Sequence, residues 1–278
     1  MNEERRTRLA KAANQVRKGI LTEVYSAQSG HPGGSLSIAD VMTYLYQEEL
    51  RVDPANPKWE DRDRLVLSKG HVCPALYAAL AQKGFFPWEE LTTFRKTGSR
   101  LQGHPDLNKV PGVDFTAGSL GQGVSAAAGI ALAGKIAGKD YRVYAILGDG
   151  ELQEGEVWES AMFSAHYKLD NLCYIIDNNG LQIDGNIQDV CSPYPIDKKF
   201  EAFGFDVIII DGHSFDQIEM ALDMAKKVTG KPVAIIAKTV KGKGISFMEG
   251  KASWHGSAPN EEQYKTAMED LAKIEEVL

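Results

Sequence analysis

The segment Gly148-Asp149-Gly150 places a carboxylate between two glycines directly after an apolar run, and Asn178-Asn179-Gly180 follows the next such run. Mg²⁺ prefers about six oxygen ligands, usually a few from protein and the rest from phosphates and water. An Asp carboxylate, an Asn amide oxygen and a backbone carbonyl would suit it, and flanking glycines let a diphosphate approach closely. Taken alone, Asp149 could equally be a turn residue or a helix N-cap. The two segments together favour a metal-bound diphosphate.

Histidines form a second group of candidate residues. Five of the six histidines adjoin a glycine, and four of these are the candidates, namely His31, His71, His104 and His255. Their spacing fits no local zinc motif. Because imidazole donates, accepts and exchanges protons near neutral pH, we expect these four to contact a polyol and a diphosphate. The other two, His166 and His213, are interpreted as structural.

The elements that must position these residues alternate along the chain. Apolar runs predict strands at 64–67, 141–147, 172–177, 205–210 and 232–237, and several are apolar throughout. Helical patterns occur at 71–83, 121–137, 153–166 and 215–227. Further helices are predicted at 3–28, 37–50 and 261–278, the second from a capping signal at Ser37. This order predicts a doubly wound α/β fold, a mostly parallel sheet with helices on both faces, in a single domain spanning 1–278.

The segments that follow the predicted strands are polar and rich in glycine. They read SKGH, GDGELQEG, NNGLQIDG, DGHS and KTVKGKG. Ligands of open α/β sheets bind at the carboxyl ends of the strands. The site is therefore expected at this edge of the sheet.

A dinucleotide site is a competing interpretation. The stretch GQGVSA at 121–126 fits the fingerprint G-x-G-x-x-A, and Asp149 follows after the next predicted strand. The fingerprint needs a buried strand directly before its first glycine, and the preceding VPGVDFTAGSL contains no sustained apolar run. A nicotinamide or flavin oxidoreductase is therefore disfavoured.

Composition narrows the class of protein further. Hydrophobic residues make up 43% and charged residues 25% of the 278 residues, and the net charge is −7. No block of Lys and Arg is present, which argues against nucleic-acid and membrane partners. Three widely separated cysteines suit a reducing compartment, and no apolar signal segment is seen. A cytoplasmic location is expected.

The segments GDGELQEG and IIDNNGLQIDG resemble the signature of thiamine diphosphate enzymes, and their details resemble transketolases in particular. Other stretches similar to transketolase segments, in the same order, are SGHPGGSLS, LSKGH, GHPDLNKVPGVDFTAGSLGQG and WHGSAPN. The resemblance covers essentially the whole chain. It corresponds to the N-terminal, diphosphate-binding part of a full-length family member.

The resemblance implies roles for individual residues at the substrate and the diphosphate. His31 and His255 match residues near the C3 hydroxyl of the substrate, and His104 matches one that contacts the C1 hydroxyl of the donor. His71 and Gly150 match positions at the diphosphate.

Further roles concern the metal, the aminopyrimidine and the protons. The metal ligands implied are Asp149, Asn179 and the carbonyl of Leu181. Gly118 and Leu120 match backbone positions along the aminopyrimidine, although Ser119 stands where many members have proline. Glu154 matches an acid in a proton network between active sites, a position that an exposed helix acid would also explain. Lys241 and Lys243 could favour a diphosphate electrostatically, but they are interpreted as part of a solvated basic loop.

The implied function is transfer of a two-carbon ketol unit from a ketose phosphate to an aldose phosphate, with thiamine diphosphate and Mg²⁺ or another divalent cation such as Ca²⁺. The glutamate that activates the aminopyrimidine and the arginines that hold the sugar phosphate lie in later segments of the family. The resemblance therefore implies a second, C-terminal transketolase subunit carrying the pyrimidine-binding and C-terminal domains, with two copies of each chain.

Two alternatives to this function remain. One is the alpha subunit of a 2-oxo-acid dehydrogenase, which GHPGG and the second GHP disfavour because a 2-oxo acid has no C3 polyol. The other is a non-catalytic cofactor-binding subunit. Turnover restored by a matching partner would distinguish the transketolase subunit from this alternative.

Overall fold

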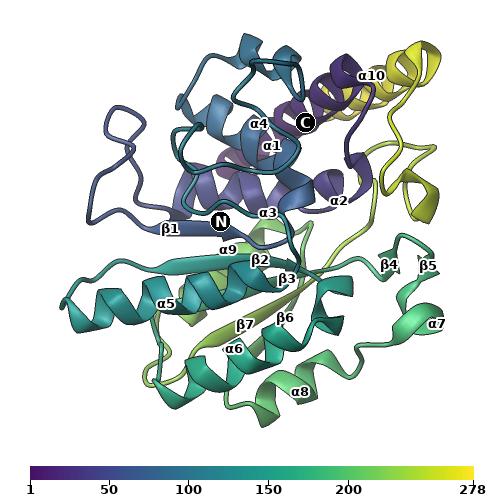
Figure 1. Ribbon diagram of the computed structural model, residues 1–278. Coiled ribbons are helices and arrows are strands. Elements are labelled where there is room, and N and C mark those ends of the chain that lie inside the picture. The colour runs from purple at the N-terminus through teal and green to yellow at the C-terminus, as the bar shows by residue number, and fades with distance from the viewer.

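The computed structural model describes all 278 residues and contains a five-stranded sheet in which every neighbouring pair is parallel (Figure 1). The strand order is β1-β2-β3-β7-β6. The strands are β1 (Arg64–Leu67), β2 (Val143–Gly148), β3 (Leu172–Asn178), β6 (Asp206–Asp211) and β7 (Val233–Lys238). All five lie within two residues of the predicted strands. The mostly parallel α/β fold is confirmed.

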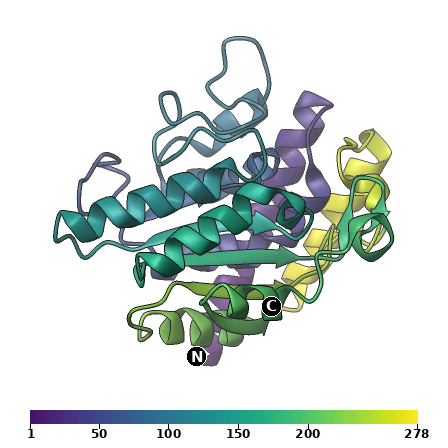
Figure 2. The ribbon, with the colours of Figure 1, turned by 60° about the horizontal axis from the view of Figure 1, so that its bottom comes forward.

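Helices cover both faces of the sheet, as Figures 1 and 2 show. One hydrophobic cluster joins alternate strand residues such as Ile146 and Ile235 to α1 (Glu3–Ala27), α3 (Ala39–Tyr44), α4 (Cys73–Lys83), α9 (Phe215–Ala225) and α10 (Glu261–Glu276). The other cluster joins the intervening residues, such as Ala145 and Ile236, to α5 (Gln122–Ile136), α6 (Gly155–His166) and α8 (Ile196–Ala202). Burial on both faces explains why the central strands are apolar throughout.

A short hairpin and two short helices follow β3 and were not predicted. The hairpin pairs β4 (Leu181–Gln182) with β5 (Gly185–Asn186), and α7 (Ile187–Cys191) and α8 come next. Two-residue strands carry no periodic pattern, so the sequence gives no signal for them. The hairpin extends the carboxyl edge of the sheet beside the end of β3 (Figure 1).

The single helix predicted at 37–50 is wrong. This region forms α2 (Pro32–Ser37), then α3, then a π-helical turn at Leu45–Glu49. Ser37 does not cap a helix N-terminus, because it is the last residue of α2, where its hydroxyl donates to the carbonyl of Gly34 at 2.9 Å and to the carboxylate of Asp177. A tertiary hydrogen bond thus replaces the predicted cap.

The dinucleotide interpretation is also contradicted. No strand lies between β1 and α5, so the fingerprint lacks its preceding strand. Gly121 has φ of +82° directly before α5, a backbone conformation that favours glycine. A Cβ at Gly123 would lie 2.6 Å from the Cα of Ser68. Gly123 is therefore needed for close packing of α5 against the end of β1.

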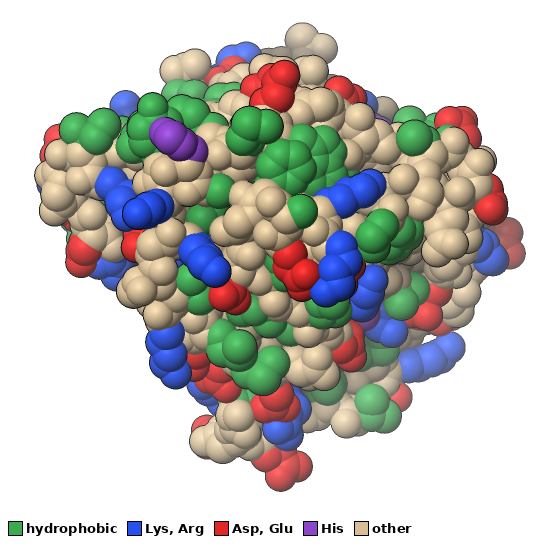
Figure 3. Space-filling view, turned by 90° about the horizontal axis from the view of Figure 1, so that it is seen from below, with side chains coloured by type: hydrophobic (Ala, Val, Ile, Leu, Met, Phe, Trp, Pro, Cys, Tyr) green, Lys and Arg blue, Asp and Glu red, His purple; other side chains and the backbone are tan.

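The molecular surface mixes charges of both signs. On the face seen in Figure 3, acidic and basic side chains are interspersed rather than gathered by sign. This matches the absence of a basic block in the sequence. None of the helices is both long and apolar enough to span a membrane.

Candidate active site

A cavity of about 360 Å³ opens at the carboxyl edge of the sheet, and we call it the main cavity. It is formed by segments that follow β1, β2, β3 and β7, together with the start of α2. The predicted site residues that line it are His31, His71, His104, Leu120, Asp149, Gly150, Glu154, Asn179, Leu181 and His255. Gly118 is exposed and does not line the main cavity. The structure thus brings nearly all of the predicted residues to one place.

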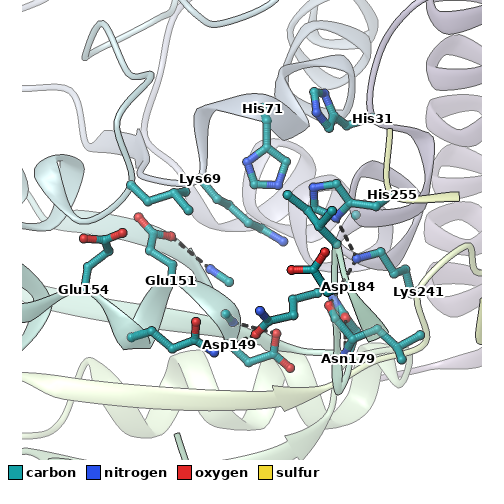
Figure 4. A pocket seen from close by; sticks show the side chains of 18 of the residues that line it. His31, Lys69, His71, Asp149, Glu151, Glu154, Asn179, Asp184, Lys241 and His255 are labelled. Carbon is teal, nitrogen blue, oxygen red and sulfur yellow. Dashed lines mark hydrogen bonds between the residues drawn. The ribbon is translucent and has the colours of Figure 1, made fainter. Parts of the chain in front are cut away.

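Three histidine rings meet on one side of the main cavity (Figure 4). The ring centroids are 5.1 Å apart for His31 and His71, 5.4 Å for His31 and His255, and 5.2 Å for His71 and His255. His31 directly precedes α2, His71 lies in the 3-10 turn after β1, and His255 follows the 3-10 turn Ala252–Trp254. Residues far apart in the sequence therefore form one cluster.

The environment keeps these imidazoles neutral. Burial, with smaller contributions from Arg95, His104 and Lys241, lowers the pKa of His31 to about 4. Burial and the nearby Lys241 ammonium lower the pKa of His255 to about 3. Nδ1 of His31 is buried and has no hydrogen-bond partner in the protein. A neutral imidazole with a free polar atom can accept a proton or a hydrogen bond from a ligand.

Asp149 is held by main-chain and side-chain donors at the end of β2. Its Oδ1 accepts from the N–H of Gly150 at 2.9 Å, and its Oδ2 accepts from Gly180 N–H at 2.6 Å and Asn178 Nδ2 at 2.9 Å. Burial first, and then the neighbouring Asp177, raise the pKa of Asp149. A bound cation would favour the ionised form that burial disfavours.

The three predicted metal ligands fit a hard cation. Oδ1 of Asn179 accepts from the N–H of Leu181 at 3.1 Å, and the carbonyl of Leu181 accepts from Nζ of Lys241 at 3.1 Å. These two oxygens and Oδ1 of Asp149 each accept one hydrogen bond, which leaves each an acceptor position. Figure 4 shows Asp149 and Asn179 on the side of the cavity opposite the histidines. An all-oxygen set with one carboxylate suits Mg²⁺ or Ca²⁺.

The interpretation of Lys241 as part of a solvated loop is wrong. Lys241 is 2% exposed and lines the main cavity, where its Nζ contacts Nδ1 of His255 at 2.9 Å as well as the Leu181 carbonyl. Burial lowers its pKa to about 8. Lys243 is more exposed and pairs with Glu249 at 3.3 Å. The buried ammonium of Lys241 therefore adds positive charge where a diphosphate is expected.

Asp177 is a site residue that the sequence reasoning missed. It is fully buried at the end of β3, where it pairs with the ammonium of Lys69 and accepts from Ser37, Thr239 and Asn179. Burial alone would raise the pKa of Asp177, but Lys69 and the donors hold it below its ordinary value. The sequence feature that could have identified Asp177 is its position as an acidic residue at the end of an otherwise apolar strand. This network fixes Asn179 and Lys69 at the cavity wall.

Substitution of Asp177 by asparagine is expected to lower the free energy of unfolding by about 3–5 kcal/mol, because it leaves the ammonium of Lys69 buried and unpaired. Urea denaturation at pH 7 measures the change, with Asp184→Asn, an exposed residue at the same edge, as the control. A lowered carboxyl pKa stabilises the fold above the unfolded pKa, and this contribution is lost as pH falls through the folded pKa. The difference from wild type should therefore shrink in acid. Equal stability of the two proteins at pH 7 would contradict the role.

Glu151 was not predicted as a binding residue, and the structure gives it a supporting role. Its carboxylate is 2% exposed and accepts from Ser68 Oγ at 2.5 Å, Gly121 N–H at 2.9 Å and Gly148 N–H at 3.1 Å. It therefore ties together three segments that surround the main cavity. Glu154 differs, because it is exposed at the rim, directly before α6.

The remaining two histidines lie outside the main cavity. Nε2 of His213 accepts from the N–H of Val240 at 2.9 Å, so its Nδ1 donates to Asp40 at 2.7 Å. His166 is exposed at the end of α6. The interpretation of both as structural agrees with these positions.

Comparison with known proteins agrees with this geometry. The family model described as "Transketolase, thiamine diphosphate binding domain" matches residues 9–273. The chain is 47% identical to the 6-deoxy-6-sulfo-D-fructose transketolase subunit SqwG of Clostridium sp. (strain MSTE9), with 97% of this chain and 98% of that protein covered. It is 43% identical to an apulose-4-phosphate transketolase subunit of Phocaeicola vulgatus, with 92% of this chain and 91% of that protein covered.

Full-length transketolases match over part of their length. The human transketolase is 46% identical, with 89% of this chain but 39% of that protein covered. The crystal structure of the Campylobacter jejuni transketolase superposes with a TM-score of 0.88 at 36% identity, covering 98% of this chain and 43% of that one. These matches favour the transketolase prediction over the 2-oxo-acid dehydrogenase alternative. The chain belongs to the transketolase family and corresponds to its thiamine diphosphate-binding domain.

Proposed function

We propose that this chain is the diphosphate-binding subunit of a two-subunit transketolase that moves a two-carbon ketol unit from a ketose phosphate to an aldose phosphate. The observation that carries the proposal is the meeting of His31, His71 and His255 on one side of the main cavity, with Asp149 and Asn179 on the other. One side offers neutral imidazoles for the hydroxyls of a polyol, and the other offers oxygens for a cation. The cavity therefore has groups that could bind a sugar and groups that could bind a metal-bound diphosphate cofactor.

At the diphosphate end, Asp149, Asn179 and the Leu181 carbonyl would hold a divalent cation. Lys241 and His71 lie in the same cavity and would donate to phosphate oxygens, with Gly150 letting them approach closely. When bound, thiamine diphosphate would supply the electron sink that the transferred carbon unit needs. The protein itself orients the cofactor and neutralises its charge.

At the sugar end, His31 and His255 would handle the proton of the C3 hydroxyl as the C2–C3 bond breaks and forms. Their low pKa values keep them in the accepting form at neutral pH. His104 lies exposed at the same cavity and would contact the C1 hydroxyl of the donor. Within the cluster, His31 and His255 would thus serve the sugar, and His71 would serve the diphosphate.

A second subunit is part of the proposal. The relatives matched nearly end to end carry the word "subunit" in their names, while the full-length transketolases are more than twice as long as the matched region. Large apolar side chains also stay exposed on α5 and α6, among them Ile136 at 79% and Met162 at 62%. A partner with pyrimidine-binding and C-terminal domains would complete the site. Two copies of each chain would give closed twofold symmetry.

Asp149→Ala is expected to weaken binding of thiamine diphosphate in the presence of Mg²⁺ by at least about a hundredfold. Mutation of residues that only hydrogen-bond to metal ligands already lowers metal affinity by about ten- to a hundredfold, and Asp149 is proposed as a ligand itself. Calorimetric titration with and without Mg²⁺ measures this, in the assembled complex if binding to the single chain is too weak. The matched control is Asp189→Ala, an exposed acid on α7. Wild-type affinity in the Asp149 variant, or binding indifferent to Mg²⁺, would overturn the metal assignment.

A further inference from the structure

Asn178 is a buried amide at the carboxyl end of β3, and both polar atoms of its side chain have partners in the protein. Its Nδ2 donates to Oδ2 of Asp149 at 2.9 Å and to the hydroxyl of Tyr194 at 2.7 Å. Its Oδ1 accepts from the ammonium of Lys238. Asn178 does not line the main cavity. It can therefore influence a bound ligand only through the residues that it holds.

The strand register brings the partners of Asn178 together. Asn178 and Lys238 are directly paired across β3 and β7. Gly148, which precedes Asp149, is paired with Asp177, which precedes Asn178, across β2 and β3. The carboxyl ends of three neighbouring strands thus form one chain of hydrogen bonds from Lys238 through Asn178 to Asp149, which we call the amide relay.

The two ends of the amide relay fix the direction in which the amide of Asn178 faces. An ammonium only donates hydrogen bonds, and an ionised carboxylate only accepts them. Oδ1 of Asn178 must therefore face Lys238, and Nδ2 must face Asp149. Rotation of the amide by half a turn would place two donors together at one end and two acceptors together at the other. Nζ of Lys238 also lies 5.6 Å from the centroid of the Tyr194 ring, a cation–π contact that helps to hold this ammonium.

The amide relay also decides which oxygen of Asp149 is left for a cation. Oδ2 of Asp149 accepts from Nδ2 of Asn178 and from the N–H of Gly180, so its two acceptor positions are occupied. Oδ1 accepts only from the N–H of Gly150 and keeps one position. Loss of the bond from Asn178 would leave one main-chain donor on each oxygen, and the carboxylate would no longer be held with one oxygen satisfied and the other available.

We propose that Asn178, itself oriented by Lys238, is a positioning residue that holds Asp149 with Oδ1 toward the cation. The proposal rests on the metal assignment in the function proposed above. Residues that hydrogen-bond to metal ligands fix the orientation of those ligands, and their mutation typically lowers metal affinity. The amide relay would supply this support from two strands that neighbour the strand preceding Asp149.

The first test uses the isolated chain without cation or cofactor. The N–H of Gly150 donates to Oδ1 of Asp149, so its amide NMR signal reports the position of this oxygen. Lys238→Met, a change at an exposed residue, is expected to shift the Gly150 signal, whereas the control Lys231→Met, at an exposed lysine just before β7, should not. In an Asn178→Leu background, Lys238→Met should have no further effect. An unchanged signal in Lys238→Met, or the same shift in both backgrounds, would overturn the proposal.

The second test measures Mg²⁺-dependent binding of thiamine diphosphate by calorimetry, in the assembled complex if the single chain binds too weakly. Asn178→Leu is expected to weaken binding by about tenfold to a hundredfold. Lys238→Met should weaken it less, and Lys238→Arg, which keeps a cation that only donates, should restore it.

A double-mutant cycle separates positioning from a structural role. In the Asp149→Ala background, Asn178→Leu should weaken binding no further, because residues that act through one another are not additive. Equal losses in both backgrounds would make Asn178 a general structural residue and overturn the proposal. Wild-type binding that is indifferent to Mg²⁺ would instead refute the metal assignment, and the NMR test would still decide whether the amide relay holds Asp149.

Discussion

Replacement of His31 by alanine is expected to lower ketol transfer by about a hundredfold to ten-thousandfold, the range typical of a lost general acid or base. His31 has a buried, unpartnered Nδ1, and burial keeps its ring neutral at physiological pH. Its side chain caps no helix N–H, so the fold should not depend on the imidazole. Steady-state kcat of the reconstituted enzyme measures the loss, and calorimetric titration should show cofactor affinity close to wild type.

The matched control for His31→Ala is His166→Ala, which removes an exposed imidazole from the end of α6. This variant should retain full activity. The same loss is expected for His255→Ala, although that change also removes a partner of Lys241. Full transfer activity in His31→Ala would return the residue to a structural role before α2.

The isolated 278-residue chain is expected to show no detectable ketol transfer, and a matching pyrimidine-binding subunit should restore it. Activation of thiamine diphosphate needs a carboxylate that shifts its protonation on the aminopyrimidine side. Glu151 is fixed by three donors, and Asp149 faces the proposed cation. Mixing the chain with its candidate partner, thiamine diphosphate, Mg²⁺ and a ketose and aldose phosphate pair tests this directly.

Two controls sharpen the mixing experiment. The same mixture made with Asp149→Ala should stay inactive, which ties the restored activity to this chain. Sedimentation should show a complex with two copies of each chain. Ketol transfer by the isolated chain at the rate of the mixture would overturn the need for a partner.

Local patterns were sufficient for the main elements of the fold. The central strands are apolar on both faces and end at polar residues, so β2 and β3 were predicted within two residues. The segment from Pro32 to Glu49 could not be divided correctly, because its break follows the bond from Ser37 to Asp177. That partner lies on a distant strand, and no local pattern reports it.

The site divides in the same way. Asp149 and Asn179 could be found because they stand in glycine-rich turns at strand ends, and the four histidines because each adjoins a glycine. Lys241 could not be found, because a charged residue in a glycine-rich turn is usually solvated. Asp177 lies within β3, and the residues that pair with its buried carboxylate are distant in the sequence. Lys241 is buried against His255, and Asp177 is buried against Lys69 and Ser37. These partners come from other segments of the chain.

The carboxylate of Glu151 has a consequence for the thermodynamics of cofactor binding. It fastens the ends of β1 and β2 to the turn before α5 within the protein alone. Fixing the backbone of one residue costs about 1–2 kcal/mol of conformational entropy. In these three segments the entropy cost is met when the protein folds. The cavity wall is therefore ordered before the cofactor binds, and the binding free energy is not reduced by ordering it.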